Sequence, residues 1–357
     1  MTTSAKTLLL LVLLVLVTGI ALNVGKFSLT PQQLWDVIQA KITGNSGADD
    51  PALSRDMTVF WQIRLPRIAA ALIIGGGLAI AGAAYQGMFR NPLVSPDILG
   101  VSAGAGVGAI LGIFAGQSML TIQLFAFTGG LCVVALVYSV ARLARQHDPV
   151  LALVLVGIAV SALCGSAISL MKILADPYTQ LPAMTFWLLG GLSAISPDDI
   201  KTTAPLIFAG MVPLLLLRWR MNLLSLSDEE ARALGLNVTV TRLIFIASAT
   251  LITASAVSVA GIIGWLGLIV PHITRLLVGA NFSHQLPVSL LIGAIMLLLT
   301  DTLARTIAPI ELPLGILTSA VVHLSLFFCC CRPGGTDERC PDHPRPGGRL
   351  RREVNTH

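Results

Sequence analysis

Apolar segments of about 20 residues recur along almost the whole chain, separated by short polar stretches. An α-helix needs about 20 apolar residues to cross the roughly 30 Å of hydrocarbon in a bilayer. Because backbone exposed to lipid has to satisfy its own hydrogen bonds, the pattern predicts an all-α polytopic membrane protein. About ten spans are expected, at 7–24, 66–88, 96–116, 119–142, 149–173, 200–217, 241–260, 262–279, 286–305 and 313–331.

The first apolar segment, and the run that holds the seventh and eighth, can each be interpreted in two ways. The first follows Lys6 and resembles a signal peptide, but its length and the lack of a clear small-x-small cleavage site favour a first transmembrane helix. The seventh and eighth spans form one apolar run that Gly261 and Gly264 divide. A run of that length indicates two helices joined by a tight turn.

Basic residues predict the orientation of the spans. They flank alternate ends: Lys6, Arg90, Arg142, Arg145, Arg218, Arg220 and Arg275. Since basic residues concentrate in cytoplasmic loops, all of these fall on one side if the termini are cytoplasmic. The largest outer segments are then about 25–62 and 174–199, which we expect to form short interfacial helices and loops.

The stretch RNPLVSPDILG at 90–100 predicts a hairpin between the second and third spans. Pro92 stops a helix because it lacks an N–H donor and disfavours helix in the residue before it. Ser95, Pro96 and Asp97 then suit the N-cap, the first position and the first turn of a new helix. Two interpretations stand: a structural turn, or a border of a transport pathway to which Gln86, Asn91 and Pro92 contribute.

The third span carries glycines at four-residue spacing on one face, namely Gly100, Gly104, Gly108 and Gly112. Small residues in this pattern are typical of close helix packing. A smooth backbone surface lining a passage is the second interpretation of the same residues.

Charged residues near the outer ends of two spans oppose the positive-inside pattern. Arg64 and Arg67 precede the second span, and Pro66 between them suits a helix start. Asp301 and Arg305 are spaced to pair along the ninth span. The arginines are explained either by interfacial positioning and local salt bridges, or by docking of an acidic partner outside the membrane.

The connection after the sixth span contains an isolated polar helix. Ser227 and Glu230 fit a capping box, the helix is expected to run to about Leu234, and Gly235 supplies its stop. It is either an ordinary loop helix or a surface knob (226–235) that a cytoplasmic protein binds.

Composition agrees with a membrane protein and excludes several functions. Of 357 residues, 55% are hydrophobic and only 11% charged, and the net charge of +5 is too modest to indicate nucleic-acid binding. No nucleotide-binding motif is complete, and no His, Cys or Asp spacing predicts a metal or catalytic site. An ion-coupled secondary transporter is a weaker alternative, because the deep spans hold almost no acidic residues.

The motifs together resemble the FecCD family. They are RLPR at 64–67, QGMFRNPLVSPDILG at 86–100, LSLSDEEARALGLNV at 224–238, GWLGLIVPHITRLLVG at 264–279, DTLAR at 301–305 and ELPLGILTS at 311–319. The family comprises permease subunits of bacterial ABC importers for iron–siderophore complexes, haem and cobalamin. The resemblance covers about residues 7–322, and RNPLVSPDILG is most similar to the siderophore branch.

The resemblance implies a type II ABC importer permease in the bacterial inner membrane, with cytoplasmic termini. It implies a second permease subunit, two cytoplasmic ATPases that use ATP and Mg, and a periplasmic substrate-binding protein, with no cofactor on this chain. Carried over by motif, Arg64, Arg67 and Arg305 dock the binding protein. The ATPase coupling helix comprises Leu226, Ser227, Asp228, Glu229, Glu230, Ala231, Leu234 and Gly235.

The end of the chain departs from the family pattern. Residues 323–331 read HLSLFFCCC, and residues 333–357 are rich in Pro, Gly and Arg, so we expect a permease domain over 1–332 and a disordered tail. Codons for 323–331 exist that, shifted by one base, encode the expected Ala-Pro-Phe pattern. We therefore hypothesise a frameshift near Val322, which resequencing of the gene would test.

Overall fold

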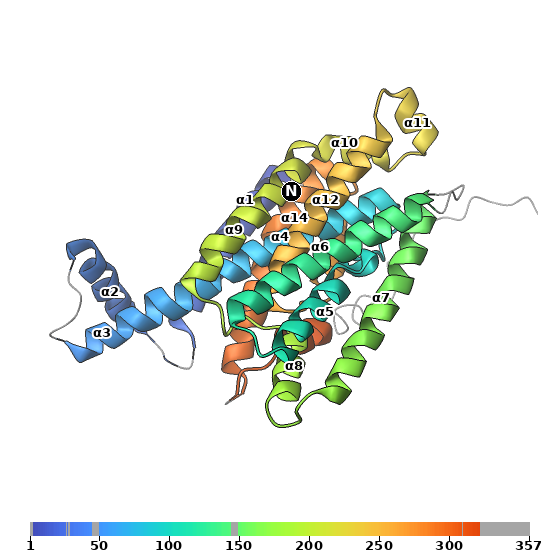
Figure 1. The fold of residues 1–357 in the computed structure, drawn as a ribbon. Helices are drawn as coiled ribbons and strands as arrows, with labels where there is room; N and C mark the ends of the chain where they lie inside the picture. The colour runs from blue at the N-terminus through green and yellow to red at the C-terminus, as the bar shows by residue number, and fades with distance from the viewer. Residues whose placement is uncertain are drawn as a thin grey trace, which may run out of the picture.

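The computed structural model describes residues 3–25, 27, 29–44, 50–143, 149–308 and 310–321, and all regular structure within them is helical (Figure 1). The elements are α1 (Thr3–Asn23), α2 (Pro31–Thr43), α3 (Pro51–Thr58), the π-helix η1 (Val59–Arg64), α4 (Leu65–Phe89), the 3₁₀-helix η2 (Pro96–Leu99), α5 (Val101–Phe114), α6 (Met119–Leu143), α7 (Pro149–Leu174), α8 (Gln180–Leu189), α9 (Pro197–Leu216), α10 (Arg218–Leu224), α11 (Asp228–Ala233), α12 (Val238–Ala260), α13 (Leu266–Val278) and α14 (Phe282–Thr306). A further helix occupies 314–321.

The predicted fold class is confirmed. Seven helical runs are long and apolar enough to cross a membrane: α1, the run from α3 through α4, α6, α7, α9, α12 and α14. Helices α5 and α13 are shorter and apolar, and they coincide with the third and eighth predicted spans. The tenth predicted span begins with the helix at 314–321, and its remainder lies outside the described residues.

The second span begins earlier than the sequence indicated. We expected a helix start at Pro66, but α3, η1 and α4 form one continuous helical run from Pro51. In η1 the backbone N–H of Leu65 donates to the Phe60 carbonyl five residues back, which is the π pattern. Pro66 follows at once in the first turn of α4, so its missing N–H falls where the hydrogen-bond register is already shifted.

Helices α4, α12 and α14 form the centre of the bundle, whereas α1 and α7 lie at its periphery. Glycines bring the central helices close together. A Cβ on Gly75 of α4 would lie 2.5 Å from the Gly293 carbonyl oxygen of α14, and one on Gly82 would lie 1.8 Å from the Gly267 carbonyl oxygen of α13. Such contacts exclude any side chain, so the packing of α4 depends on glycine.

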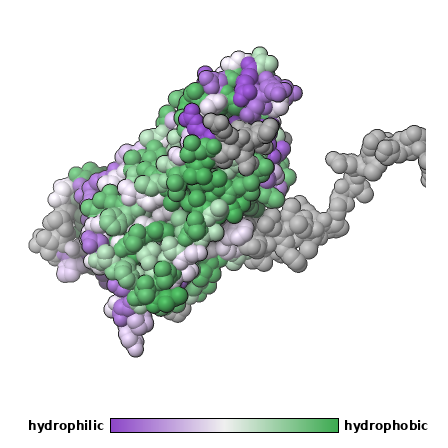
Figure 2. All heavy atoms as spheres, turned by 45° about the vertical axis from the view of Figure 1, so that its right-hand side comes forward, coloured by the Kyte–Doolittle hydropathy of each residue, from purple (hydrophilic) through white to green (hydrophobic). Residues whose placement is uncertain are grey.

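The polar elements gather at the two ends of the bundle. Figure 1 shows α2 and α3 projecting from one end, while α11 projects from the other. Figure 2 shows an apolar surface across the body of the molecule and a hydrophilic cap over the knob at one end. The Lys6 ammonium donates to the Leu277 carbonyl at 2.5 Å, so the start of α1 lies beside the end of α13.

Several sequence expectations concern residues outside the described part of the chain. They are Arg145, the end of the tenth span, the disordered tail at 333–357 and the frameshift near Val322. These remain predictions.

Candidate functional site

A buried charge cluster occupies the α2–α3 end of the bundle. The Arg67 Nε of α4 donates to Asp301 Oδ1 of α14 at 2.9 Å, and its Nη1 lies 3.0 Å from Glu311 Oε2. On the other side of the same carboxylate, the Arg305 Nε lies 3.3 Å from Asp301 Oδ2. Asp301 is fully buried, and its carboxylate joins one arginine of α4 to one of α14.

Arg64 lies beside this cluster but has a different environment. Its guanidinium donates to the backbone carbonyls of Leu22 and Phe27, which hold the end of α1 and the following chain against η1. Both Arg64 and Arg305 lie close to Gly25, where a Cβ would be 3.3 Å from the Arg64 Nη2 and 3.6 Å from the Arg305 Nη1. Within the described chain Arg64 pairs with no carboxylate.

The three arginines are therefore together, as the sequence indicated, but they are not exposed. Arg64, Arg67 and Arg305 are 3%, 5% and 6% exposed. Our placement of Arg64 and Arg67 just outside the start of the span needs correction, because the helical run continues past them and neighbouring elements cover both. The local salt-bridge interpretation describes Arg67 and Arg305, whereas docking of a partner stays a prediction. Three positive charges face the two carboxylates, which leaves one positive charge uncompensated.

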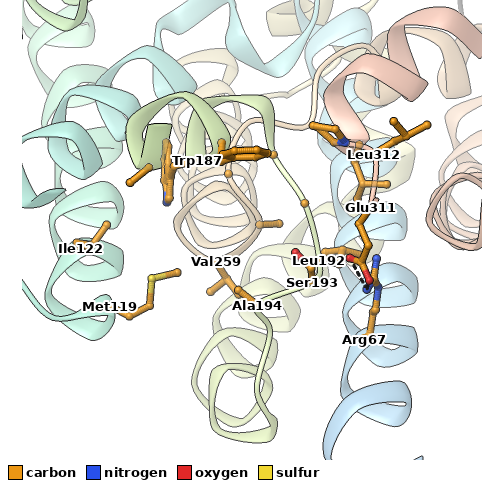
Figure 3. Close-up of a pocket in the computed structure, with 18 of the residues that line it drawn as sticks. Arg67, Met119, Ile122, Trp187, Leu192, Ser193, Ala194, Val259, Glu311 and Leu312 are labelled. Carbon is orange, nitrogen blue, oxygen red and sulfur yellow. Dashed lines mark hydrogen bonds and ion pairs between the residues drawn. The ribbon is translucent and has the colours of Figure 1, made fainter. Parts of the chain in front are cut away.

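The Arg67–Glu311 pair also borders a cavity of about 300 Å³ (Figure 3). Trp187 of α8 and Met119 at the start of α6 line it, as do Ser193 and Ala194 between α8 and α9. Its apolar wall and its one ion pair resemble the composition of small-molecule sites, which are mostly apolar with a few polar groups.

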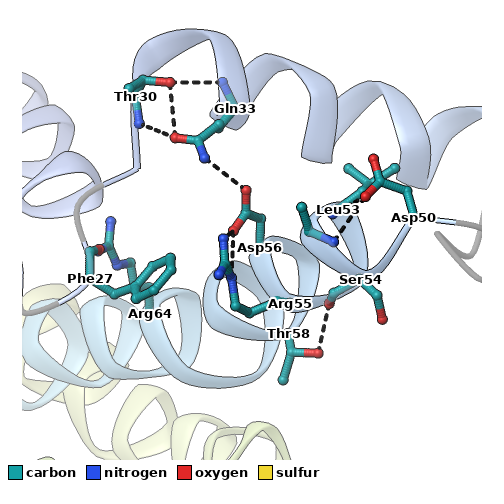
Figure 4. Close-up of polar contacts among 11 residues, drawn as sticks. Phe27, Thr30, Gln33, Asp50, Leu53, Ser54, Arg55, Asp56, Thr58 and Arg64 are labelled. Carbon is teal, nitrogen blue, oxygen red and sulfur yellow. Dashed lines mark hydrogen bonds and ion pairs between the residues drawn. The ribbon is translucent and has the colours of Figure 1, made fainter.

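Polar contacts hold the short helices α2 and α3 to the same end of the bundle (Figure 4). Thr30 and Gln33 form a capping box that begins α2. The Gln33 side chain then donates to Asp56 of α3 at 3.0 Å, and Arg55 lies 3.4 Å from the same carboxylate. This confirms the expectation of short helices in the first outer segment and joins them to the start of η1.

At the opposite end, α11 is the polar knob that the sequence predicted. Ser227 accepts from the Glu230 N–H, and the Glu230 carboxylate accepts from the Ser227 N–H at 3.0 Å and its hydroxyl at 2.8 Å. These hydrogen bonds lower the pKa of Glu230 below its usual range. Gly235 ends the helix at φ +84°, in the left-handed region.

Two exposed leucines flank α11, which also has one buried contact with the bundle. Leu226 and Leu234 are 38% and 61% exposed, and Glu229 is also exposed, whereas Ala231 is buried against the bundle. A short helix that presents leucines to solvent is suited to an apolar groove on another protein.

One carboxylate ties the knob to two spans. Asp228 Oδ1 accepts from the Arg90 Nη2 at 3.1 Å and from the Arg242 Nη2 at 3.0 Å. Arg90 is the left-handed C-cap of α4, and Arg242 lies buried in the first turns of α12. Asp228 therefore links α11 to the end of α4 and to the start of α12.

The hairpin at 90–100 forms as predicted, with two differences. Asn91 and Pro92 are exposed in the turn, and Pro96 begins η2 rather than an α-helix, because Gly100 at φ +79° separates η2 from α5. The Ser95 side chain makes no cap hydrogen bond; instead Asp97 accepts from the Ser102 hydroxyl. The Gln86 amide is buried and donates to the Leu268 carbonyl at 3.0 Å.

The glycine face of α5 packs against α6 within the chain. A Cβ on Gly104 would lie 2.5 Å from the Gly129 carbonyl oxygen of α6, and one on Gly108 would lie 1.9 Å from that of Phe125. The assignment of Gly100, Gly104 and Gly108 as pathway residues stays a prediction. The close-packing interpretation fits these distances, because only glycine allows the two backbones to approach so closely.

Comparison with known proteins decides the family. The model of the FecCD transport family matches residues 10–332. This chain belongs to the FecCD transport family.

The relatives of this FecCD protein are transport permeases. It is 38% identical over 313 residues to a molybdate import system permease protein of Haemophilus influenzae. The aligned residues cover 87% of this chain and 91% of that protein. It is 42% identical over 272 residues to a Helicobacter pylori protein described as a probable iron chelatin transport system permease, covering 75% and 81% of the two chains.

A solved structure agrees with this assignment. The inward-facing conformation of a metal-chelate type ABC transporter matches with a TM-score of 0.80 and 35% identity, over 91% of this chain and 98% of that one. The FecCD protein described here is therefore an integral membrane permease of the ABC importer class.

Sequence reasoning missed residues that complete both sites. Glu311, quoted only within a motif, contacts Arg67 across 244 residues of chain, and Arg242 was not singled out at all. The signal available for Arg242 was a basic residue at the start of the predicted apolar span 241–260, where an acidic partner is expected.

Proposed function

We propose that this chain is the translocation subunit of an ATP-driven importer that carries an iron–siderophore complex across the bacterial inner membrane. In this proposal it pairs with a second permease subunit, receives its cargo from a periplasmic binding protein, and is driven by two cytoplasmic ATPases that use ATP and Mg. The chain binds no cofactor and performs no covalent chemistry.

The observation that carries the proposal is the capped, exposed α11 joined through Asp228 to α4 and α12. A helix that presents leucines to solvent while an ion-pair network fixes its base is suited to receive force from a partner and pass it to the spans. The end with α11 also carries Lys6, Arg90 and Arg275, which supports a cytoplasmic location for it and for the N-terminus.

The ATPase partnership is tested by purification of tagged protein from its native membranes in mild detergent, with mass spectrometry of the proteins that co-purify. A near-stoichiometric P-loop ATPase is expected. Leu234→Glu should abolish its co-purification, because a charge at this exposed position opposes burial in a groove. Ile42→Glu is the matched control, since Ile42 is 81% exposed on α2 at the opposite end. Wild-type protein that folds but carries no ATPase would refute the proposal.

We propose Arg64, Arg67 and Arg305 as the docking set for acidic residues of the binding protein. Arg64 is the strongest of the three, because the two described acids of the cluster pair with the other two arginines. The one positive charge of this cluster that no described carboxylate pairs with favours an acidic partner residue.

The identity of the transported substrate is tested separately from the assembly of the importer. An iron–siderophore complex is supported by RNPLVSPDILG, by the iron chelatin relative and by the metal-chelate transporter structure. Molybdate is the second candidate, because the Haemophilus influenzae relative matches nearly the full chain. Uptake of radiolabelled ferric siderophores, haem, cobalamin and molybdate, compared between cells with and without the gene, distinguishes them. Loss of molybdate uptake alone would overturn the siderophore assignment.

A further inference from the structure

A second basic site lies behind the knob. Where α6, α7, α11 and α12 meet there is a cavity of about 170 Å³, which is the volume of about five or six water molecules. Its charged lining is three arginines, Arg142, Arg232 and Arg242, with the single acid Asp228. Two positive charges at the cavity are therefore uncompensated.

The hydrogen-bonding capacity of these arginines is incompletely used. Arg242 is 8% exposed; its Nη2 binds Asp228, but its Nε is buried and has no partner within the described residues. The side chains of Arg142 and Arg232 are exposed and make no hydrogen bond or ion pair with other described residues. A buried N–H without an acceptor is costly, so the site is suited to a ligand that brings acceptor oxygens.

We infer that this cavity binds the phosphate of an anionic lipid head group. Arginines recognise phosphate through paired N–H donors, and basic pockets between membrane helices bind acidic head groups. The cavity lies at the helix ends: α6 ends at Leu143, and α7 and α12 begin at Pro149 and Val238.

The surroundings favour a lipid over free phosphate, which shares the same chemistry. Leu143, Val240 and Leu243 beside the cavity are 79%, 50% and 45% exposed, which provides an apolar surface for acyl chains. The inference requires only that this end of the bundle lies at a membrane surface, and it depends on neither the cargo nor the ATPase.

The test uses the full-length protein, delipidated in detergent and titrated with phosphatidylglycerol or phosphatidylcholine under native mass spectrometry. Wild type should bind one phosphatidylglycerol in preference to phosphatidylcholine. Arg142→Gln with Arg232→Gln should weaken this binding by roughly 25- to 30-fold, because each basic residue near a membrane surface contributes about a fivefold preference for acidic lipid. Both side chains are exposed and unpaired, so the double variant should fold.

Arg220→Gln with Arg275→Gln is the matched control, since it removes two basic residues at the same end that do not line the cavity. This control should bind phosphatidylglycerol as wild type does. Equal binding of the two lipids, or an equal loss in the control and the cavity variant, would overturn the inference. Displacement of the lipid by millimolar inorganic phosphate would assign the site to a free anion and overturn the lipid assignment.

Discussion

Replacement of Asp301 by asparagine tests whether the buried charge cluster depends on one carboxylate. The substitution keeps the size of the side chain and removes its charge. Asp301 is fully buried and lies 2.9 Å from Arg67 and 3.3 Å from Arg305, so both guanidiniums lose their shared partner. Arg67 keeps Glu311, but Arg305 keeps no carboxylate within the described chain.

The expected loss of stability follows from burial. Removal of one partner of a buried ion pair costs about 3–5 kcal/mol, because an uncompensated charge remains in the interior. Each kcal/mol lowers the Tm of a large domain by about 2 °C, so the apparent Tm of Asp301→Asn should fall by about 6 °C or more. Thermal unfolding in detergent, at a fixed scan rate, measures this change.

Glu311→Gln is the matched control, because it removes a carboxylate from the same arginine at a more exposed position. The Glu311 side chain is 34% exposed, and pairs of that kind contribute at most about 1 kcal/mol. Its Tm should therefore change by about 2 °C or less. If the two variants lose the same stability, burial of Asp301 does not govern the cluster and the reasoning fails.

Three further predictions concern packing, docking and pH. Gly108→Ala should destabilise the protein by about 1–3 kcal/mol through collision with the Phe125 carbonyl, whereas Gly165→Ala on α7, with no neighbour within 4 Å, should cost nothing in the same unfolding assay. Arg64→Gln should weaken the affinity for the binding protein in a direct binding titration more than Arg67→Gln does, while both should lower Tm because both guanidiniums are buried and hydrogen-bonded; an unchanged affinity of Arg64→Gln would remove Arg64 from the docking set. Because hydrogen bonds from Ser227 lower the pKa of Glu230, the capping box stabilises α11 above the ordinary glutamate range near 4.3, and this contribution is lost as the pH falls through the lower folded-state pKa. The protection factors of residues 228–234, corrected for the intrinsic pH dependence of amide exchange, should therefore fall in acid, and Ser227→Ala should show low protection at both pH values.

Local rules predicted the features that local sequence determines. The capping box of Ser227 and Glu230 fixed the position of α11, and Pro92 with Pro96 fixed the hairpin, because caps and prolines act over a few residues. The spans were found for the same reason, since hydropathy over a window of about 20 residues requires no knowledge of neighbours.

Contacts between distant residues were not predictable in this way. Arg67 was identified as unusual, but its partners Asp301 and Glu311 follow it by more than 230 residues, and no local pattern links them. Pro66 misled the prediction of the helix start, because a π segment is a shift in backbone hydrogen bonding that side-chain patterns do not report. The four-residue glycine spacing was compatible with two uses, and only the position of α6 shows the close packing.

The π segment also separates length from direction. A π-helical turn absorbs one residue more than an α-helical turn, and one residue of an α-helix corresponds to a rotation of about 100°. Deletion of a single residue within Val59–Arg64 would therefore relax η1 to an α-helix and leave α2 and α3 facing nearly the same direction around the axis of α4, because the wide turn had already absorbed that residue. A chain that differs by one residue in this segment can thus keep the same face of α2 and α3 exposed, whereas the same change in a regular α-helical turn would rotate that face by about 100°.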